Sequence, residues 1–408
     1  MRNTLIITIL VLLNGVSKAQ GWKEIHRFNP QQTLQKVKFY NEKLGFTVGS
    51  LYNGSTENIH ITRDGGKTWE NASSGYTSMR FMDIFIQNSD TIFMSGNDGL
   101  IIRSYDSGKT WKTMTSNTKE QLWGIYFTDE KTGHAVGSNG IIIRTTNGGL
   151  DWNIVQSGIS NLFYDVFFLS KEIGFASGSN VLMKTVDGGS SWNKVENFPF
   201  EAPADWIRCI KMVNSEVGYA CADIGRIYKT LDGGESWERL NSGVQDPLFE
   251  LDFSDVDHGI VCGFNGVILS TVDGGINWTP MLSPLGTENL YSIDVVSKDV
   301  AYICTHTGKI LQLNSAVNTN QLGRNNIVEK LYPNPSNSDQ VTLLLNREIH
   351  ENYLNLEVCN SIGDCHTALI NWIDKDKINI NISEEKNGLL FIRKVQKEGS
   401  YSIPFIKL

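Results

Sequence analysis

The sequence has little of what several functional classes require. Six cysteines occur in 408 residues, none of them in a Cys-x-x-Cys pair, and the seven histidines include no His-Glu-x-x-His motif. Neither a metal site nor a cofactor is therefore expected. The formal net charge is −8, whereas nucleic-acid binding calls for a basic surface. The most apolar stretch, residues 5–13, is too short to cross a bilayer as a stable helix. We expect neither nucleic-acid binding nor a membrane span.

Residues 1–19 have the pattern of a signal peptide. Arg2 supplies the positive start, residues 5–13 form a short apolar core, and Ser17-Lys18-Ala19 precedes a suitable cleavage point before Gln20. No cysteine follows the apolar core, so a lipid anchor at this end is not expected. The pattern predicts an exported, soluble protein.

An eight-residue box, Ser/Thr-x-Asp-x-Gly-x-x-Trp, occurs six times, with Asn once in place of Asp. The recurring pairs within the boxes are Asp64 and Trp69, Asp106 and Trp111, Asn147 and Trp152, Asp187 and Trp192, Asp232 and Trp237, and Asp273 and Trp278. Adjacent tryptophans are about 40–45 residues apart, a period typical of propellers and other repeat arrays.

Each box predicts a hairpin turn. Asp bonds its own backbone and Gly accepts positive φ, and strand-forming residues lie on both sides. The Trp can pack between one repeat and the next. Catalysis needs one asymmetric site, whereas six equivalent acids would lie around a ring. We therefore interpret the box residues as structural.

The strand pattern predicts an all-β fold, a seven-bladed β-propeller over residues 20–313. Six repeats carry a box. A seventh, residues 290–313, has three strands and no box. Trp22 and Ile25 have the spacing of a strand that follows a box. We expect residues 22–28 to complete the last blade, which would hide both open edges of the ring.

Residues 314–326 read as a polar linker, and residues 327–408 as a small C-terminal β-sandwich domain. The sandwich opens with Tyr332-Pro333-Asn334-Pro335 and continues with alternating apolar strands up to Phe405-Ile406-Lys407-Leu408.

These motifs resemble two known families. The boxes resemble the Asp-box (BNR) repeats of sialidases, sortilin-type receptors and photosystem II stability/assembly-factor-type propellers. In those families the boxes are structural and lie away from the active face. Residues 327–408 resemble the type A sorting domain of the Bacteroidetes type IX secretion system. The second resemblance implies passage through the periplasm to the medium or the outer cell surface, with the secretion machinery as a partner.

The cysteines suggest two disulfides. Cys359 and Cys365 flank one predicted turn in an exported domain, and Cys209 and Cys221 face each other if the hairpin turns at residues 214–215. We interpret Cys262 and Cys304 as small buried residues.

Antiparallel blades place the boxes and the first turns on one face of the ring, and the second turns and inter-blade connections on the other. The second face carries the longer loops, residues 49–58 and 197–205, and long loops on a rigid scaffold often bind ligands. The candidate ligand-binding residues on this face are Tyr52, Phe198, Phe200, Glu201, Asp205, Trp206 and Asp223. The alternative is that they are solvated loop tips, with Trp206 in the core.

The resemblance implies a monomeric, secreted or surface-bound module that binds a protein or glycan. A sialidase-like or polysaccharide-degrading glycoside hydrolase is the alternative. Two of the three carboxylates Glu201, Asp205 and Asp223 could face one groove. However, the Arg-x-Pro segment typical of sialidases is absent, and no catalytic residue is assigned.

Overall fold

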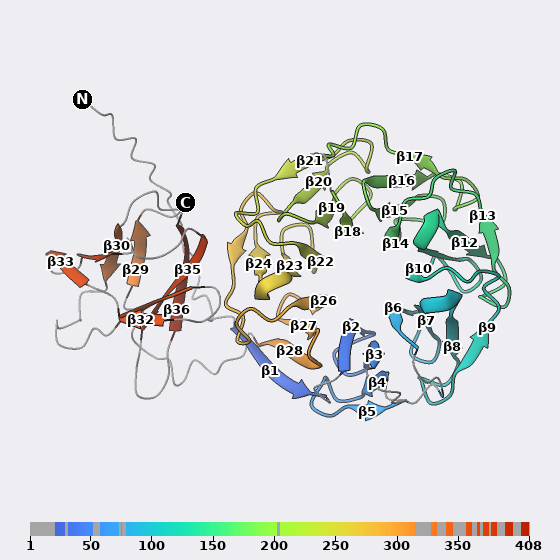
Figure 1. The fold of residues 1–408 in the computed structure, drawn as a ribbon, viewed down its shortest axis with the longest axis horizontal. Coiled ribbons are helices and arrows are strands. Elements are labelled where there is room, and N and C mark those ends of the chain that lie inside the picture. Colours follow the sequence, from blue (N-terminus) through green and yellow to red (C-terminus); the bar gives the residue numbers. More distant parts are fainter. Residues whose placement is uncertain are drawn as a thin grey trace.

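The computed structural model describes residues 21–28, 32–51, 58–72, 75, 79–201 and 205–314, together with eight strands between residues 328 and 407. Residues 21–314 form seven four-stranded antiparallel sheets arranged as a ring (Figure 1). The seven-bladed β-propeller predicted from the repeats is confirmed. Tyr52 lies outside the described residues.

The strands of each blade run from the centre of the ring to its outer edge (Figure 1). The innermost strands are β2 (Gln32–Phe39), β6 (Phe81–Ile86), β10 (Leu122–Phe127), β14 (Phe163–Phe168), β18 (Ile207–Met212), β22 (Leu248–Phe253) and β26 (Leu290–Ser297). The second strands are β3 (Gly45–Leu51), β7 (Ile92–Gly96), β11 (Gly133–Gly137), β15 (Gly174–Gly178), β19 (Gly218–Ala222), β23 (Gly259–Gly263) and β27 (Val300–Thr305). The third strands are β4 (Ile59–Thr62), β8 (Ile101–Ser104), β12 (Ile142–Thr145), β16 (Val181–Thr185), β20 (Ile227–Thr230), β24 (Ile268–Thr271) and β28 (Lys309–Asn314).

The outermost strands are short. They are β5 (Glu70–Asn71), β9 (Lys112–Met114), β13 (Asn153–Val155), β17 (Asn193–Lys194), β21 (Glu238–Leu240), β25 (Thr279–Pro280) and β1 (Gly21–Arg27). Three single-turn 3₁₀ helices, η1 (Asn97–Gly99), η2 (Ser138–Gly140) and η3 (Phe264–Gly266), form second turns.

The N-terminal strand β1 closes the ring. It pairs antiparallel with β28, with Trp22 opposite Leu313, and so becomes the fourth strand of the last blade. Trp22 is 7% exposed and packs with Leu313, Leu311 and Ile268. The chain thereby joins its first strand to its last blade, and β28 is left with no open edge.

The box forms the turn between the third and fourth strands, as the fourth box illustrates. The Thr185 hydroxyl accepts the backbone N–H of Gly189 at 2.9 Å and donates to Asp187 at 2.8 Å. Asp187 also accepts the backbone N–H of Ser191 at 2.9 Å and its hydroxyl at 2.6 Å. Gly188 and Gly189 have φ of 69° and 75°, a backbone conformation that glycine adopts without strain.

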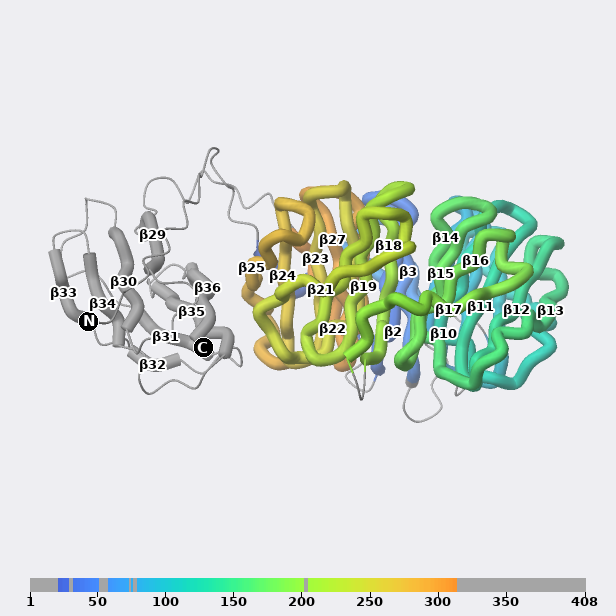
Figure 2. The backbone as a smooth tube through the Cα atoms, turned by 90° about the horizontal axis from the view of Figure 1, so that it is seen from above, coloured from blue at the N-terminus to red at the C-terminus, as the bar shows by residue number. Residues whose placement is uncertain are grey.

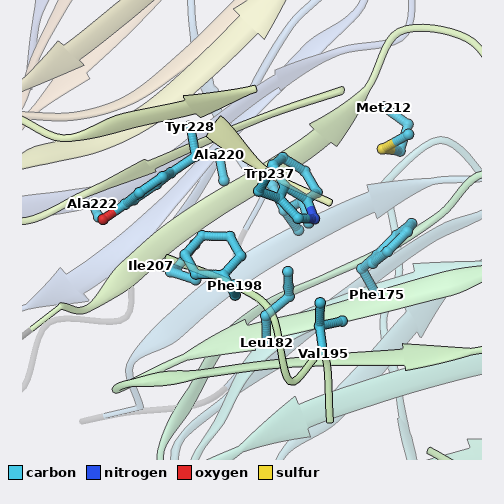
Figure 3. Close-up of a cluster of buried hydrophobic side chains, with 11 residues drawn as sticks. Phe175, Leu182, Val195, Phe198, Ile207, Met212, Ala220, Ala222, Tyr228 and Trp237 are labelled. Atoms are coloured by element: carbon cyan, nitrogen blue, oxygen red, sulfur yellow. The ribbon is translucent and has the colours of Figure 1, made fainter. Parts of the chain in front are cut away.

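The box tryptophans pack between neighbouring blades. One buried cluster, for example, joins Phe175, Leu182 and Val195 of the fourth blade to Tyr228 and Trp237 of the fifth (Figure 3). The next cluster along the chain repeats this arrangement with Trp278. These tryptophans therefore contribute apolar contacts between adjacent blades.

Figure 2 shows the ring edge-on, so that its two faces lie at the upper and lower sides of the blades. The two faces carry different turns. On the box face, box turns bond to the first turn of their own blade, as in the 2.9 Å bond from the Gly188 N–H to the Glu172 carbonyl. On the opposite side, here called the connector face, second turns bond to the inter-blade connections, as in the 2.8 Å bond from the Ser179 N–H to the Leu162 carbonyl.

The C-terminal strands pair into two four-stranded sheets. One has the order β29 (Val328–Tyr332), β30 (Gln340–Leu345), β34 (Lys377–Asn381), β33 (Ile370–Asp374). The other has the order β32 (Cys365–Thr367), β31 (Leu356–Asn360), β35 (Gly388–Lys394), β36 (Tyr401–Lys407). The backbone register places Cys359 opposite Cys365. Their disulfide, the β-sandwich and the linker remain predictions.

The predicted Cys209–Cys221 disulfide is absent. The register does place the two residues opposite each other on β18 and β19, but both are free, buried thiols. The Cys209 thiol instead points at the Leu251 carbonyl of the next blade, 3.6 Å away. Cys262 and Cys304 are also free and buried, as expected of small core residues.

Candidate ligand-binding site

The seven innermost strands share one irregularity, a β-bulge near the connector face. The register shifts by one residue at the same point in each strand, for example between Phe81 and Asp83 and between Phe163 and Asp165. In a regular strand, successive side chains point to opposite sides. Two adjacent residues could then not both face the ring axis. A bulge re-aims side chains, so the bulged residue and the one after it can both face the axis. Met82 and Asp83 on β6, and Tyr164 and Asp165 on β14, line the central cavity in this way.

The bulged residues form one layer at the connector face, and four of the seven are aromatic. Trp206 and Phe264, from a connection and a second turn, lie beside them, each 38% exposed. Neighbouring rings are in contact: Trp123 and Tyr164 have centroids 5.5 Å apart, and Phe249 and Tyr291 5.4 Å apart. We call the full set the aromatic rim: Trp123, Tyr164, Trp206, Phe249, Phe264 and Tyr291.

Arg208 lies among these rings. Its guanidinium carbon is 4.4 Å from the ring centroid of Tyr164, 5.0 Å from that of Trp206 and 5.8 Å from that of Phe249. Two hydrogen bonds to Asp223, of 2.9 and 3.2 Å, fix the guanidinium in place. The mouth of the cavity thus presents flat rings and a held arginine on a rigid scaffold.

The residues that follow the bulges include four charged side chains, which form a charged layer beneath the rim: Lys36, Asp83, Asp165 and Glu250. Lys36 is 2.5 Å from a Glu250 oxygen and 3.5 Å from an Asp83 oxygen. Burial opposes a charged ammonium, but Glu250 and Asp83 outweigh it and raise the pKa of Lys36 well above its ordinary value. Burial raises the pKa of Asp83, an effect only partly offset by Lys36.

Asp165 completes this layer without an ion pair. It accepts two backbone N–H groups, from Val166 at 2.8 Å and from Ile210 at 2.9 Å. No cationic side chain among the described residues comes within 4.0 Å of it. Burial raises the pKa of its carboxyl, and the charge of the more distant Lys36 offsets this only in part.

Inner-strand carboxylates also join adjacent blades. Asp83 accepts the N–H of Ile125 at 2.9 Å, and Asp252 accepts that of Val295 at 2.9 Å. Asp165 makes the same kind of bond to Ile210. The space along the ring axis continues from the cavity toward the box face, and we call the whole of it the channel. In its half nearer the box face, Asp252 is also paired with Lys211 at 2.6 Å. Most charges along the axis therefore have structural partners.

The residues predicted to bind a ligand divide into two groups. Trp206 and Asp223 lie at the aromatic rim, so the alternative that places Trp206 in the core is wrong. Phe198 is 5% exposed and packs against Tyr228 and Trp237 (Figure 3).

Three further predicted residues support the 197–205 connection. Phe200 packs on Phe198, with ring centroids 4.6 Å apart. Asp205 is fully buried, bonded to Tyr228 and 3.2 Å from Arg226. Glu201 is paired with Arg226 at 3.1 Å and with Arg239 at 2.6 Å. Phe198 and Asp205 thus face the interior, a correction to their predicted role.

The carboxylates suggested for a glycoside hydrolase do not share a groove. Glu201, Asp205 and Asp223 are each paired with an arginine, and none of them lines the central cavity. Within the described part of the chain, no group of His, Cys, Asp and Glu could hold a metal ion. Nor does that part contain a helix long and apolar enough to cross a membrane.

The rim residues Trp123, Tyr164, Phe249 and Tyr291 were missed by the sequence analysis. Their signal is positional: when the repeats are aligned on their boxes, each lies second in an inner strand. Simple alternation does not show that this position faces the cavity, because the bulge is visible only in the register.

Comparisons with known proteins agree with this architecture. The model of the family described as photosynthesis system II assembly factor YCF48 matches three overlapping segments, residues 15–119, 71–146 and 145–248. No sequence among curated proteins matches the chain significantly.

Three solved structures illustrate the likeness. YCF48 bound to D1 peptide is similar at 19% identity and a TM-score of 0.59, over 72% of this chain and 96% of that one. YCF48 from Cyanidioschyzon merolae is similar at 20% identity and a TM-score of 0.58, over 72% and 99%. The GH74 xyloglucanase from Xanthomonas campestris is similar at 11% identity and a TM-score of 0.57, over 80% and 60%.

At these identities the solved structures show the fold alone. The family match is more specific, because its segments together span residues 15–248, more than half of the 408 residues. The chain belongs to the photosynthesis system II assembly factor YCF48 family of BNR-repeat propellers.

Proposed function

We propose that the propeller is a protein-binding module and that its binding surface is the aromatic rim. The observation that carries the proposal is the cluster of aromatic rings around Arg208 at the connector face, among which Trp206 is 38% exposed. Trp, Tyr and Arg dominate the binding energy of protein interfaces, because they present large rigid surfaces together with polar groups. A similar propeller, YCF48, has been solved with a bound D1 peptide, which supports a protein ligand.

The rim suits this role better than the box face does. Its rings touch one another and Arg208 is already held by Asp223, so little side-chain freedom is lost on binding. On the box face, exposed apolar residues such as Val186, Leu231 and Val272 belong to separate blades.

A photo-crosslinking experiment tests the location. A photoreactive amino acid replaces Trp206 in one variant and Leu231, 60% exposed on the box face, in a matched control. The variants are incubated with a displayed library of random peptides. Crosslinking should concentrate at position 206. Equal capture at both positions, or capture at 231 alone, would contradict the proposal. Saturable binding of a glycan with no peptide capture would favour a glycan-binding module, and hydrolysis of that glycan the glycoside hydrolase alternative.

We further propose that the chain is exported by a type IX secretion system. Support comes from the signal-peptide pattern of residues 1–19 and from the Tyr332-Pro333-Asn334-Pro335 opening of a C-terminal unit rich in strands. A chain truncated after residue 326 should remain in the periplasm of a bacterium that carries this system. Efficient appearance of that truncated chain in the medium would refute the assignment.

A further inference from the structure

The aromatic rim opens into a cavity of about 310 Å³ on the ring axis. This volume lies at the lower end of the range for ligand pockets, about 300–1,000 Å³. Its walls include Trp123, Tyr164, Phe249 and Tyr291, and its floor includes Asp165 and the other members of the charged layer. The cavity therefore suits one or two side chains rather than a large ligand.

Charged side chains of both signs line the cavity. The cations facing it are Lys36 on β2, Arg80 before β6 and Arg208 on β18. The carboxylates are Asp83 on β6, Asp165 on β14 and Glu250 on β22, with Asp223 bonded to Arg208. Cys209 is the other titratable group of the floor. Three cations and three carboxylates therefore line the cavity, and their pairing decides which of them is open to a ligand.

Of the three carboxylates that line the cavity, Asp165 is the one with no cation within 4.0 Å among the described residues. Lys36 pairs with Glu250 and Asp83, and Arg208 pairs with Asp223. Asp165 has two backbone N–H donors and no cation within 4.0 Å. A buried carboxylate in this position is stabilised by an incoming positive charge, because low dielectric strengthens their attraction.

We propose that this cavity receives a lysine or arginine side chain of the partner protein, with its charged end directed at Asp165. The inference rests on the proposed function and names the chemistry that the rim would recognise. The aliphatic stem lies against Trp123 and Tyr291, and the cation passes the faces of aromatic rings, which attract positive charge. The wall already shows this chemistry, since the Arg208 guanidinium lies over Tyr164 and Phe249.

An organic cation fits this cavity better than a metal ion. The described residues contain no set of three His, Cys, Asp or Glu side chains close enough to coordinate one. The faces of the aromatic rings are not metal ligands, whereas they can enclose an ammonium or guanidinium group. Arg208 does not fill the place, because Asp223 holds it in the wall.

The test uses peptides selected from a random displayed library on the full chain, with clones that still bind Trp206→Ala discarded. Each lysine of a selected peptide is replaced by Nε-acetyl-lysine and each arginine by citrulline, which remove the charge and keep most of the shape. One such replacement should weaken binding by about tenfold or more.

Two variants of the protein test the same point. Asp165→Asn should abolish the difference between charged and neutral peptides. Asp252→Asn is the matched control: Asp252 makes the same bond to the next blade, but it lies in the other half of the channel and should leave the preference intact. Gln35→Lys places a cation on the cavity wall without removing a bond between blades, and should weaken the charged peptides only.

The outcomes separate the two proposals. Rim-dependent peptides without lysine or arginine, or peptides indifferent to neutralisation, would overturn the cation inference and leave the binding module standing. An equal effect of Asp165→Asn and Asp252→Asn would overturn it too, since the effect would then be structural. If Asp165→Asn does not fold, Gln35→Lys decides, and unchanged binding refutes the inference. If no peptide depends on Trp206, the proposed function itself fails.

Discussion

The third box exchanges the roles of two residues, and this exchange leads to a sharp prediction. In the other boxes an Asp accepts a hydrogen bond from a Ser, Thr or Asn four residues later, as Asp187 does from Ser191 at 2.6 Å. In the third box Asn147 donates its amide to Asp151 at 3.1 Å. Donor and acceptor have changed places, so the turn keeps its bond. The substitution Asn147→Asp would set two carboxylates against each other.

The structure sets the size of the effect. The change removes one exposed hydrogen bond, worth about 1 kcal/mol. Two unit charges about 3 Å apart repel by about 1 kcal/mol in water and about 5 kcal/mol at an effective dielectric constant near 20. Because Asn147 and Asp151 are at the surface, the repulsion lies near the lower figure. We expect Asn147→Asp to lower the free energy of unfolding by about 2 kcal/mol.

Urea unfolding of four proteins measures this effect: the unchanged chain, Asn147→Asp, Asp151→Thr and the double variant. The double variant recreates the arrangement of the second box, in which Thr110 donates to Asp106 at 2.6 Å, and should recover most of the loss. Repulsion raises the pKa of the paired carboxyls in the folded state. The repulsive part of the penalty is therefore present above that pKa and disappears as pH falls below it.

Two results would refute the reasoning. If Asn147→Asp unfolds at the same urea concentration as the unchanged chain, the exchanged bond has no energetic role. If the double variant is as unstable as the sum of the two single variants, the residues do not interact across the turn.

Three further predictions concern closure, pH and a turn glycine. Trp22→Ala should lower the free energy of unfolding by about 3–5 kcal/mol, because it empties a buried site in the closing strand. If urea unfolding shows a loss of less than about 1 kcal/mol, β1 does not close the ring as described. Hydrogen bonds from Thr68 and Ser191 lower the pKa of Asp64 and Asp187 to about 2. The stability these boxes contribute is present above the ordinary pKa near 4 and should fall between about pH 4 and pH 2. When unfolding is measured at a series of pH values, Asp187→Asn should lose less stability over that interval than the unchanged chain. If both lose stability with the same slope, the Asp187 carboxylate does not stabilise its turn. Gly266→Ala should destabilise the folded chain by about 2 kcal/mol or more, because φ is 72° and a Cβ would lie 1.9 Å from the Gly286 carbonyl oxygen. Unfolding at the midpoint of the unchanged chain would contradict this.

Local chemistry in the sequence was enough to predict most of the ring. Asp187-Gly188-Gly189 specifies a turn through bonds within eight residues, and its repetition sets the number of blades. The Trp22 register located the closing strand, because the same spacing recurs after every box. Antiparallel order then assigned the boxes and the long connections to opposite faces, independently of any long-range contact.

The tertiary structure decided which side chains meet. Trp123, Tyr164, Phe249 and Tyr291 are some 40 residues or more apart in the chain, and a bulge in each inner strand turns them to one mouth. Conversely, residues that are close in the sequence can lie in different environments in the fold.

Phe198 and Trp206 illustrate that separation, because one lies in the core and the other on the rim. Hydrophobicity alone does not distinguish them. Asp165 has no ion pair among the described residues because Lys36 pairs with Glu250 instead. Lys36 and Glu250 are more than two hundred residues apart in the sequence, so only the fold brings them together. The sequence determined the scaffold because its turns and strands are specified by near neighbours. The site depended on closing the ring, which alone brings the seven inner strands around one axis.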